Sequence, residues 1–173
     1  RGLGDVYKRQ KRNCMEIEKI MRGILDAESC AVRNIPYTPA YDKAVELIVE
    51  HVHRRGGKLV TSGMGKAGQI AMNIATTFSS TGIPAVNLHP SEAQHGDLGV
   101  LQPNDVMLLI SNSGKTREIL ELVELARRIY PGIPMIVITG HEDSALAKLA
   151  DACLPTGGAP AVSYTHLRAH ETK

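Results

Sequence analysis

Hydrophobic positions along the chain change their spacing near residue 57. Residues 15–34 carry apolar side chains every three to four positions, which predicts an amphipathic helix that ends before Pro36. Thr38 followed by Pro39 predicts the cap and first turn of a second helix, closed by the glycine pair at 56–57. Two helices are therefore expected before the pattern changes.

Beyond residue 57, short apolar runs alternate with helical patterns. The runs predict five β-strands, at 58–62, 84–89, 105–110, 135–139 and 152–154. The helical patterns lie at 66–80, 91–95, 115–130 and 144–150. This alternation predicts an α/β fold built from parallel βαβ units with right-handed crossovers. Ligands of such sheets bind at the carboxyl ends of the strands, so the loops there are the expected site.

The two ends of the chain do not continue these patterns. Residues 1–10 and 162–173 resemble translated sequencing-adaptor sequence and are predicted to be non-native, with native disordered termini as the alternative. This leaves 11–57 as N-terminal helices and 58–161 as an α/β core whose C-terminal part is cut away.

Composition narrows the class of protein. A length of 173 residues suits one domain, and no apolar run approaches the roughly 20 residues of a membrane-spanning helix. One Phe and no Trp argue against a stacking platform for nucleic acid. The formal charge is +2, but the two ends carry +3 of it and residues 11–161 carry −1. The overall charge is therefore no evidence for an anionic partner.

Cysteine and histidine outside the strand ends suggest no site. Cys14, Cys30 and Cys153 lack metal-ligand spacing, and no secretory signal is visible, which predicts reduced thiols in a cytoplasm. Cys153 is expected in the core, and His51 and His53 on a solvated helix face.

A glycine-rich turn follows the first predicted strand. In SGMGKAG, Gly63, Gly65 and Gly68 fit the G-x-G-x-x-G pattern between a strand and a helix. Backbone N–H groups at a helix N-terminus beside Lys66 favour an anion, the alternative being a tight turn with a solvated lysine. A nucleotide P-loop does not fit, because alanine follows this lysine.

The dinucleotide interpretation of the same turn needs an acid at the end of the second strand to hold ribose hydroxyls. That strand ends in His89, and the nearest acid, Glu92, lies beyond Pro90. The pattern therefore argues against a nicotinamide cofactor.

The segment after the second strand concentrates imidazoles and carboxylates. His89, Glu92 and His95 are candidates for general acid–base work near neutral pH. Together with Asp97 they are also a conceivable metal set, but Pro90 and a glycine at 96 interrupt any helix face and the spacing matches no zinc-hydrolase signature. The prediction is no metal.

The third strand leads into SNSGKT just before a helix. Hydroxyls at 111, 113 and 116, a flexible glycine and helix N–H groups make a cradle for phosphate. Such a loop alone is more often capping and turn chemistry. Two such loops at neighbouring strand ends favour a binding site.

Four motifs together resemble a known family. GMGKAG, HPSEAQHGDLG, SNSGKT and VITGHEDSALAKLAD resemble the sugar isomerase (SIS) domain, and more narrowly the arabinose-5-phosphate isomerases. These enzymes interconvert D-ribulose 5-phosphate and D-arabinose 5-phosphate on the route to Kdo, a lipopolysaccharide and capsule sugar. The resemblance covers nearly all of residues 15–157.

The resemblance implies a three-layer α/β/α sandwich, a homotetramer with shared active sites, and catalysis without a cofactor. It implies that phosphate is held by Ser111, Asn112, Ser113 and Thr116, and that the same pocket is lined by Ser62 and Gly63. Gly65 and Lys115, which lie in the same two loops, are further expected binding residues. It places Lys66 at the sugar and His89 facing the substrate, with Glu92, His95 and Asp97 completing the motif.

The chain departs from the family at three points. Lys115 replaces the glutamate of SNSGET, the segment after Thr156 diverges, and the C-terminal histidine and CBS module are missing. The leading expectation is a truncated isomerase that binds a sugar phosphate and turns it over poorly. The alternative, suggested by Lys115, is a non-catalytic module that binds a sugar phosphate or the activated sugar CMP-Kdo.

Overall fold

The computed structural model describes residues 3–157, with side chains from residue 16 onward. Helix α1 and the segment from Pro36 onward form separate units, each described by itself. The helix α1 spans Leu3–Arg33, so it begins twelve residues before the predicted start at residue 15. Residues 8–12 are Lys, Arg and Gln, which extend a helix by propensity without an apolar stripe. The predicted origin of residues 1–10 remains a prediction, and residues 162–173 lie outside the described part.

The second helix, α2 (Ala40–Ile48), continues as the π-helix η1 (Val49–Arg54). Gly56, at φ +70°, follows it, which fits the predicted stop. The predicted Thr38 cap is wrong. The helix starts one residue late, after Pro39, and the Thr38 carbonyl, not its hydroxyl, accepts the Tyr41 N–H at 3.1 Å. Thr38 Oγ1 is buried without a hydrogen-bond partner among the described residues.

Five parallel strands form one sheet in the order β2-β1-β3-β4-β5. They lie close to the predicted runs: β1 (Leu59–Gly63), β2 (Ala85–Asn87), β3 (Val106–Ile110), β4 (Met135–Thr139) and β5 (Ala152–Pro155). The helices between them are α3 (Lys66–Ser80), α4 (Pro90–Ala93), α5 (Arg117–Ile129) and α6 (Ala145–Lys148). The predicted α/β fold with a five-stranded parallel sheet is confirmed. The 3₁₀ turn η2 (Asp97–Val100) was not predicted.

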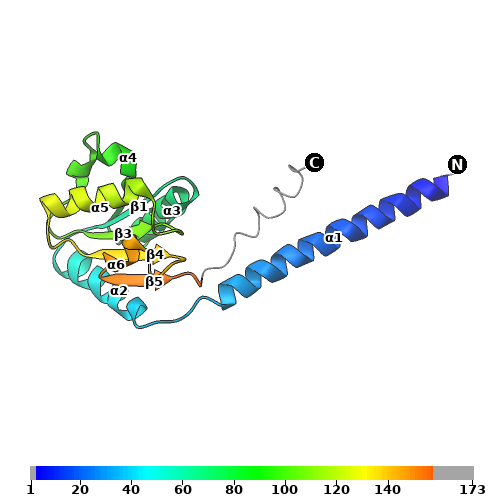
Figure 1. Ribbon diagram of the computed structural model, residues 1–173, viewed down its shortest axis with the longest axis horizontal. Coiled ribbons are helices and arrows are strands. Elements are labelled where there is room, and N and C mark those ends of the chain that lie inside the picture. Colours follow the sequence, from blue (N-terminus) through cyan, green and yellow to red (C-terminus); the bar gives the residue numbers. More distant parts are fainter. Residues whose placement is uncertain (1–2, 158–173) are drawn as a thin grey trace. The chain divides into compact units, whose positions relative to one another are not determined.

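Alternating strand residues separate two apolar layers. On β3, Met107 and Leu109 join a cluster with α5, whereas Val106 and Leu108 join a cluster with α2 and α3. Figure 1 shows the strands between α5 and α2. Both faces of the central strands are covered, which is why they read as continuous apolar runs. The sheet therefore lies between two helical layers.

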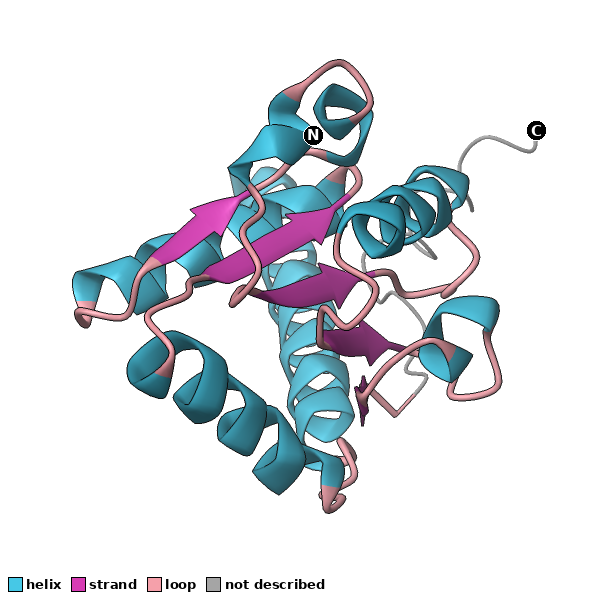
Figure 2. Cartoon of the chain, turned by 90° about the vertical axis from the view of Figure 1, so that its left-hand side faces the viewer, coloured by secondary structure: helices cyan, strands magenta, loops and turns pink. Residues whose placement is uncertain are grey.

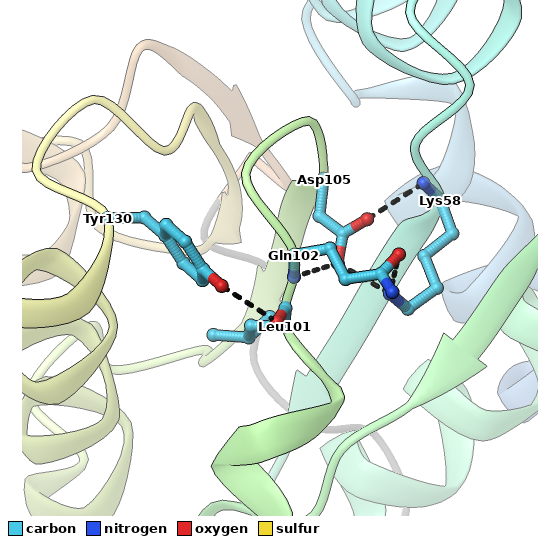
Figure 3. Close-up of polar contacts among 5 residues, drawn as sticks. All are labelled: Lys58, Leu101, Gln102, Asp105 and Tyr130. Carbon is cyan, nitrogen blue, oxygen red and sulfur yellow. Dashed lines mark hydrogen bonds and ion pairs between the residues drawn. The ribbon is translucent and has the colours of Figure 1, made fainter.

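A polar network closes the amino edge of the sheet (Figure 3). The fully buried Asp105 accepts hydrogen bonds from the Lys58 N–H at 3.0 Å and the Gln102 N–H at 2.8 Å, and pairs with Lys58 Nζ at 2.7 Å. Tyr130 donates to the Leu101 carbonyl at 3.3 Å beside it. This buried carboxylate with three donors holds the amino ends of β1 and β3 side by side.

Three side chains outside the strand ends were also assigned from sequence. His53 is exposed as expected, but Nδ1 of His51 is buried without a partner among the described residues, so the solvated helix face is only half correct. Cys153 is half-buried rather than fully in the core, and burial raises the pKa of its thiol. Over the same described range, no helix combines the length and hydropathy that crossing a membrane requires.

Candidate functional site

The strand order changes direction between β1 and β3. The chain leaves β1 toward β2 on one side, and β3 lies on the other, which is the position where open α/β sheets bind ligands. Gly63, the last residue of β1, pairs in register with Ile110, the last residue of β3. The two predicted loops therefore start side by side at the carboxyl edge (Figure 2).

Close packing explains the glycines of the β1–α3 turn. A Cβ at Gly63 would lie 2.7 Å from the Ala67 carbonyl, and one at Gly68 would lie 2.7 Å from the Gly63 carbonyl. Gly65 precedes α3 at φ +56°, a conformation that favours glycine. The turn places the exposed Lys66 as the first residue of α3, close after the end of β1.

Ser62 lies beneath this turn and is fully buried. Its Oγ donates to the Leu88 carbonyl at 2.6 Å, just before His89. Ser62 thus ties β1 to the start of the histidine-containing segment, and its predicted contact with substrate remains a prediction.

The segment after β2 presents its polar groups to solvent. His89 stands at the N-terminus of α4, and His89, Glu92, His95 and Asp97 are all exposed. Gln94 donates to Glu121 of α5 at 2.8 Å and anchors the segment. No group of three or more His, Cys, Asp or Glu side chains among the described residues is arranged to hold a metal ion.

The loop after β3 is folded on itself by hydroxyl contacts. Ser111 Oγ and Thr116 Oγ1 lie 2.7 Å apart, and the Gly114 N–H donates to Ser111 Oγ at 3.2 Å. Thr116 is the N-cap residue of α5, yet its hydroxyl makes no cap hydrogen bond to the helix. The first-turn N–H groups of α5 are therefore left for solvent or an anion. Asn112, Ser113 and Lys115 are exposed on this loop.

Charge near the loop comes from exposed side chains. Arg117 contacts Glu121 at 2.6 Å, and this hydrogen bond, followed by the one from Gln94, lowers the pKa of the Glu121 carboxyl. The Arg117 guanidinium therefore pairs with a carboxylate one turn further along α5. Lys115 projects from the loop itself and supplies a cation where the resemblance expects an acid.

The segment after β4 also reaches this site, and sequence reasoning gave it no role. Thr139 Oγ1 donates to the Asn112 carbonyl at 3.2 Å, and the Gly140 N–H donates to the same carbonyl at 3.0 Å. A Cβ on Gly114, at φ +59°, would overlap the buried Ser144 side chain. The sequence signal that could have indicated this role is the position of VITG at the end of the neighbouring strand.

Two hollows of the described surface lie away from these loops. One of about 460 Å³ runs along α5, between Leu120, Val123 and Leu149. Another of about 550 Å³ lies along α2 and η1. Of the predicted site residues at the strand ends, Ser62 and Ser111 are buried, whereas Lys66, His89 and Lys115 are exposed.

Comparison with known proteins identifies the family. The profile of the SIS domain matches residues 52–169. Arabinose 5-phosphate isomerase KdsD of Shigella flexneri is 46% identical over 118 residues, which is 63% of this chain and 35% of that protein. The chain thus spans about a third of the length of the curated relatives that it matches.

Solved structures agree in fold. A Bacteroides fragilis protein, assigned as a phosphosugar isomerase involved in capsule formation, is 65% identical, with a TM-score of 0.85. The match covers 86% of this chain and 78% of the B. fragilis chain. An Escherichia coli CFT073 protein solved with arabinose 5-phosphate is 33% identical, with a TM-score of 0.73. The match covers 90% of this chain and 85% of the E. coli chain. The sheet order and these matches agree: the chain belongs to the SIS domain family.

Proposed function

We propose that the chain carries the sugar-phosphate site of an arabinose-5-phosphate isomerase, which interconverts D-ribulose 5-phosphate and D-arabinose 5-phosphate. The observation that carries this proposal is the register of β1 with β3, which brings the β1–α3 turn and the loop at 111–116 together. The relative solved with arabinose 5-phosphate supports the substrate class.

The loop at 111–116 would hold the phosphate. Neutral N–H groups of the loop and of the α5 N-terminus provide donors, and Ser111 and Thr116 hold the loop in shape. Lys115 adds a cation at the exposed rim. Lys66, at the start of α3, would then lie toward the sugar end of the same ligand.

The reaction moves one proton between C1 and C2 of the sugar. A base removes it from one carbon to give an enediol and returns it to the other, while the carbonyl oxygen gains a proton that the neighbouring hydroxyl gives up. His89, Glu92 and His95 are the candidate bases, since all three are exposed near β2. The Lys66 ammonium would stabilise the developing oxyanion. Atoms and electrons balance within the substrate, so the step needs no cofactor.

The test is an isomerase assay of the full-length gene product with ribulose 5-phosphate. We expect arabinose 5-phosphate to form, and Lys66→Ala to lower kcat by about 100-fold through the lost oxyanion contact. The control is Lys148→Ala, an exposed lysine on α6, which should leave the rate unchanged. Absence of product above background from the unaltered protein would end the proposal.

A second candidate is a non-catalytic module that binds a sugar phosphate or CMP-Kdo. Lys115 favours it, because an exposed cation beside the loop suits a ligand with more negative charge. Titration calorimetry with arabinose 5-phosphate and CMP-Kdo separates the two candidates. Tighter binding of CMP-Kdo, together with a gain of isomerase activity in Lys115→Glu, supports the module. Equal or absent binding of both ligands contradicts it.

The remaining expectations concern assembly and location. We further propose a homotetramer in which a second subunit completes the site, and sedimentation velocity of the chain would measure the oligomer. Cytoplasmic localisation remains a prediction from the cysteine pattern.

A further inference from the structure

The end of β4 holds the backbone of the loop at 111–116. Thr139, the last residue of β4, is fully buried. Its Oγ1 donates to the Asn112 carbonyl at 3.2 Å and accepts the His141 N–H at the same distance. The Gly140 N–H donates to the Asn112 carbonyl at 3.0 Å. Two donors from one segment thus fix the direction of a single carbonyl group.

Peptide planarity converts that carbonyl direction into an N–H direction. In a trans peptide the C=O of one residue and the N–H of the next point opposite ways. Because the Asn112 carbonyl points toward β4, the Ser113 N–H points away from it. The Gly114 carbonyl accepts the Leu146 N–H at 3.1 Å, so the Lys115 N–H also points away from that segment.

The groups aimed outward are on the exposed side of the loop. Ser113 and Lys115 are exposed, and the Lys115 N–H donates to Ser113 Oγ at 3.2 Å there. Thr139 and Ser144, by contrast, are buried on the inner side. Alternate N–H groups directed to one side of a turn form a concavity that suits an anion.

We propose that Thr139 is a positioning residue for the phosphate group of the ligand. Its hydroxyl does not touch the ligand but orients the peptide between Asn112 and Ser113, so that the Ser113 N–H faces the phosphate. The inference rests on the proposed function for the identity of the ligand, a sugar phosphate. It assigns a role to a side chain at the end of β4, whose following loop was given none.

The test compares Thr139→Val with Thr139→Ser. Valine keeps the shape and removes the hydroxyl, so we expect the Kd for arabinose 5-phosphate and for inorganic phosphate to rise about tenfold. Serine keeps the hydroxyl and should restore binding. The amide resonance of Ser113 should shift in the valine variant and return in the serine variant, which records the peptide direction itself.

Thr61 provides a matched control. It is also fully buried, its Oγ1 donates to the Ala71 carbonyl at 2.8 Å, and it accepts from Asn87 Nδ2 at 3.2 Å. Thr61→Val therefore loses a hydroxyl of the same kind away from the loop. Both valine variants should lower the urea midpoint, but only Thr139→Val should weaken phosphate binding.

Titration calorimetry with both anions, and kinetics of the full-length enzyme, decide the outcome. A raised KM at unchanged kcat in Thr139→Val supports positioning of the phosphate, whereas unchanged binding, or equal weakening in Thr61→Val, overturns it. Loss of inorganic-phosphate binding in Thr139→Val, in a protein that does not bind arabinose 5-phosphate, would support positioning and refute the proposed function. If the unaltered chain binds neither anion, both proposals fall.

Discussion

Gly114 couples the candidate site to the stability of the fold. It lies in the loop after β3 at φ +59°, and a Cβ there would overlap Ser144 Oγ and Cβ and lie 3.2 Å from Thr139 Oγ1. Gly114→Ala therefore has two costs. A left-handed conformation costs a non-glycine residue roughly 1–2 kcal/mol, and overpacking costs roughly 1–3 kcal/mol. We expect a loss of about 2–5 kcal/mol in the free energy of unfolding.

Two other glycines separate these costs. Gly82 has φ +84° and open space where a Cβ would stand, so Gly82→Ala measures the conformational cost alone. Gly99 has open space and no positive φ, so Gly99→Ala should change stability by less than about 0.5 kcal/mol. The difference between the Gly114 and Gly82 variants is then the cost of the overlap with Ser144.

A second substitution tests the overlap directly. Ser144→Gly removes the atoms that the new methyl would meet, and it costs only a few tenths of a kcal/mol as a change of helix cap. We expect Gly114→Ala to be less damaging in the Ser144→Gly background, with a coupling of about 1–3 kcal/mol. Urea titration followed by far-UV circular dichroism measures all variants. Additive effects, or a Gly114→Ala variant as stable as Gly82→Ala, would refute the reasoning.

Three further predictions concern other parts of the chain. Asp105→Ala leaves its buried partners unpaired and should cost about 3–5 kcal/mol by urea titration. Hydrogen bonds from Arg54 and Arg55 lower the pKa of the Glu50 carboxyl. The ionised Glu50 side chain therefore stabilises the fold above the unfolded pKa of about 4.3. The stability difference from Glu50→Gln should therefore shrink as the pH falls below that value. Burial raises the pKa of Cys153, so iodoacetamide should modify it more slowly than the exposed Cys30, as measured by peptide mass spectrometry.

Elements bounded by local signals were predictable from sequence. Helix α3 occupies 66–80 as predicted, because Gly65 and Gly82 flank it and its apolar spacing is regular. The central strands were visible as unbroken apolar runs because both of their faces are covered. The loops at 62–68 and 111–116 could be placed together because parallel strands end at one edge.

Features that depend on distant neighbours were not visible. Nothing near Thr139 along the chain indicates that its hydroxyl meets Asn112, 27 residues away. The same holds for Ser62, whose hydroxyl was expected at the pocket but is used on the Leu88 carbonyl. Thr38 followed by proline predicted a cap, but Pro39 takes the N-cap position and the helix begins one residue later. A hydroxyl has several possible partners, and only the tertiary structure chooses among them.

The two edges of the sheet are held by different chemistry, and this bears on how the site works. At the amino edge a buried carboxylate, Asp105, is satisfied by Lys58. Toward the carboxyl edge the buried polar groups are hydroxyls, and they include Ser111, Thr139 and Ser144. Hydroxyls fix loops without placing a buried negative charge beside an incoming anion, whereas a carboxylate in the same position would repel it. In the proposed phosphate site, such an edge leaves neutral N–H donors for the phosphate and exposed lysines to attract it. Added salt should therefore slow association more than it speeds release.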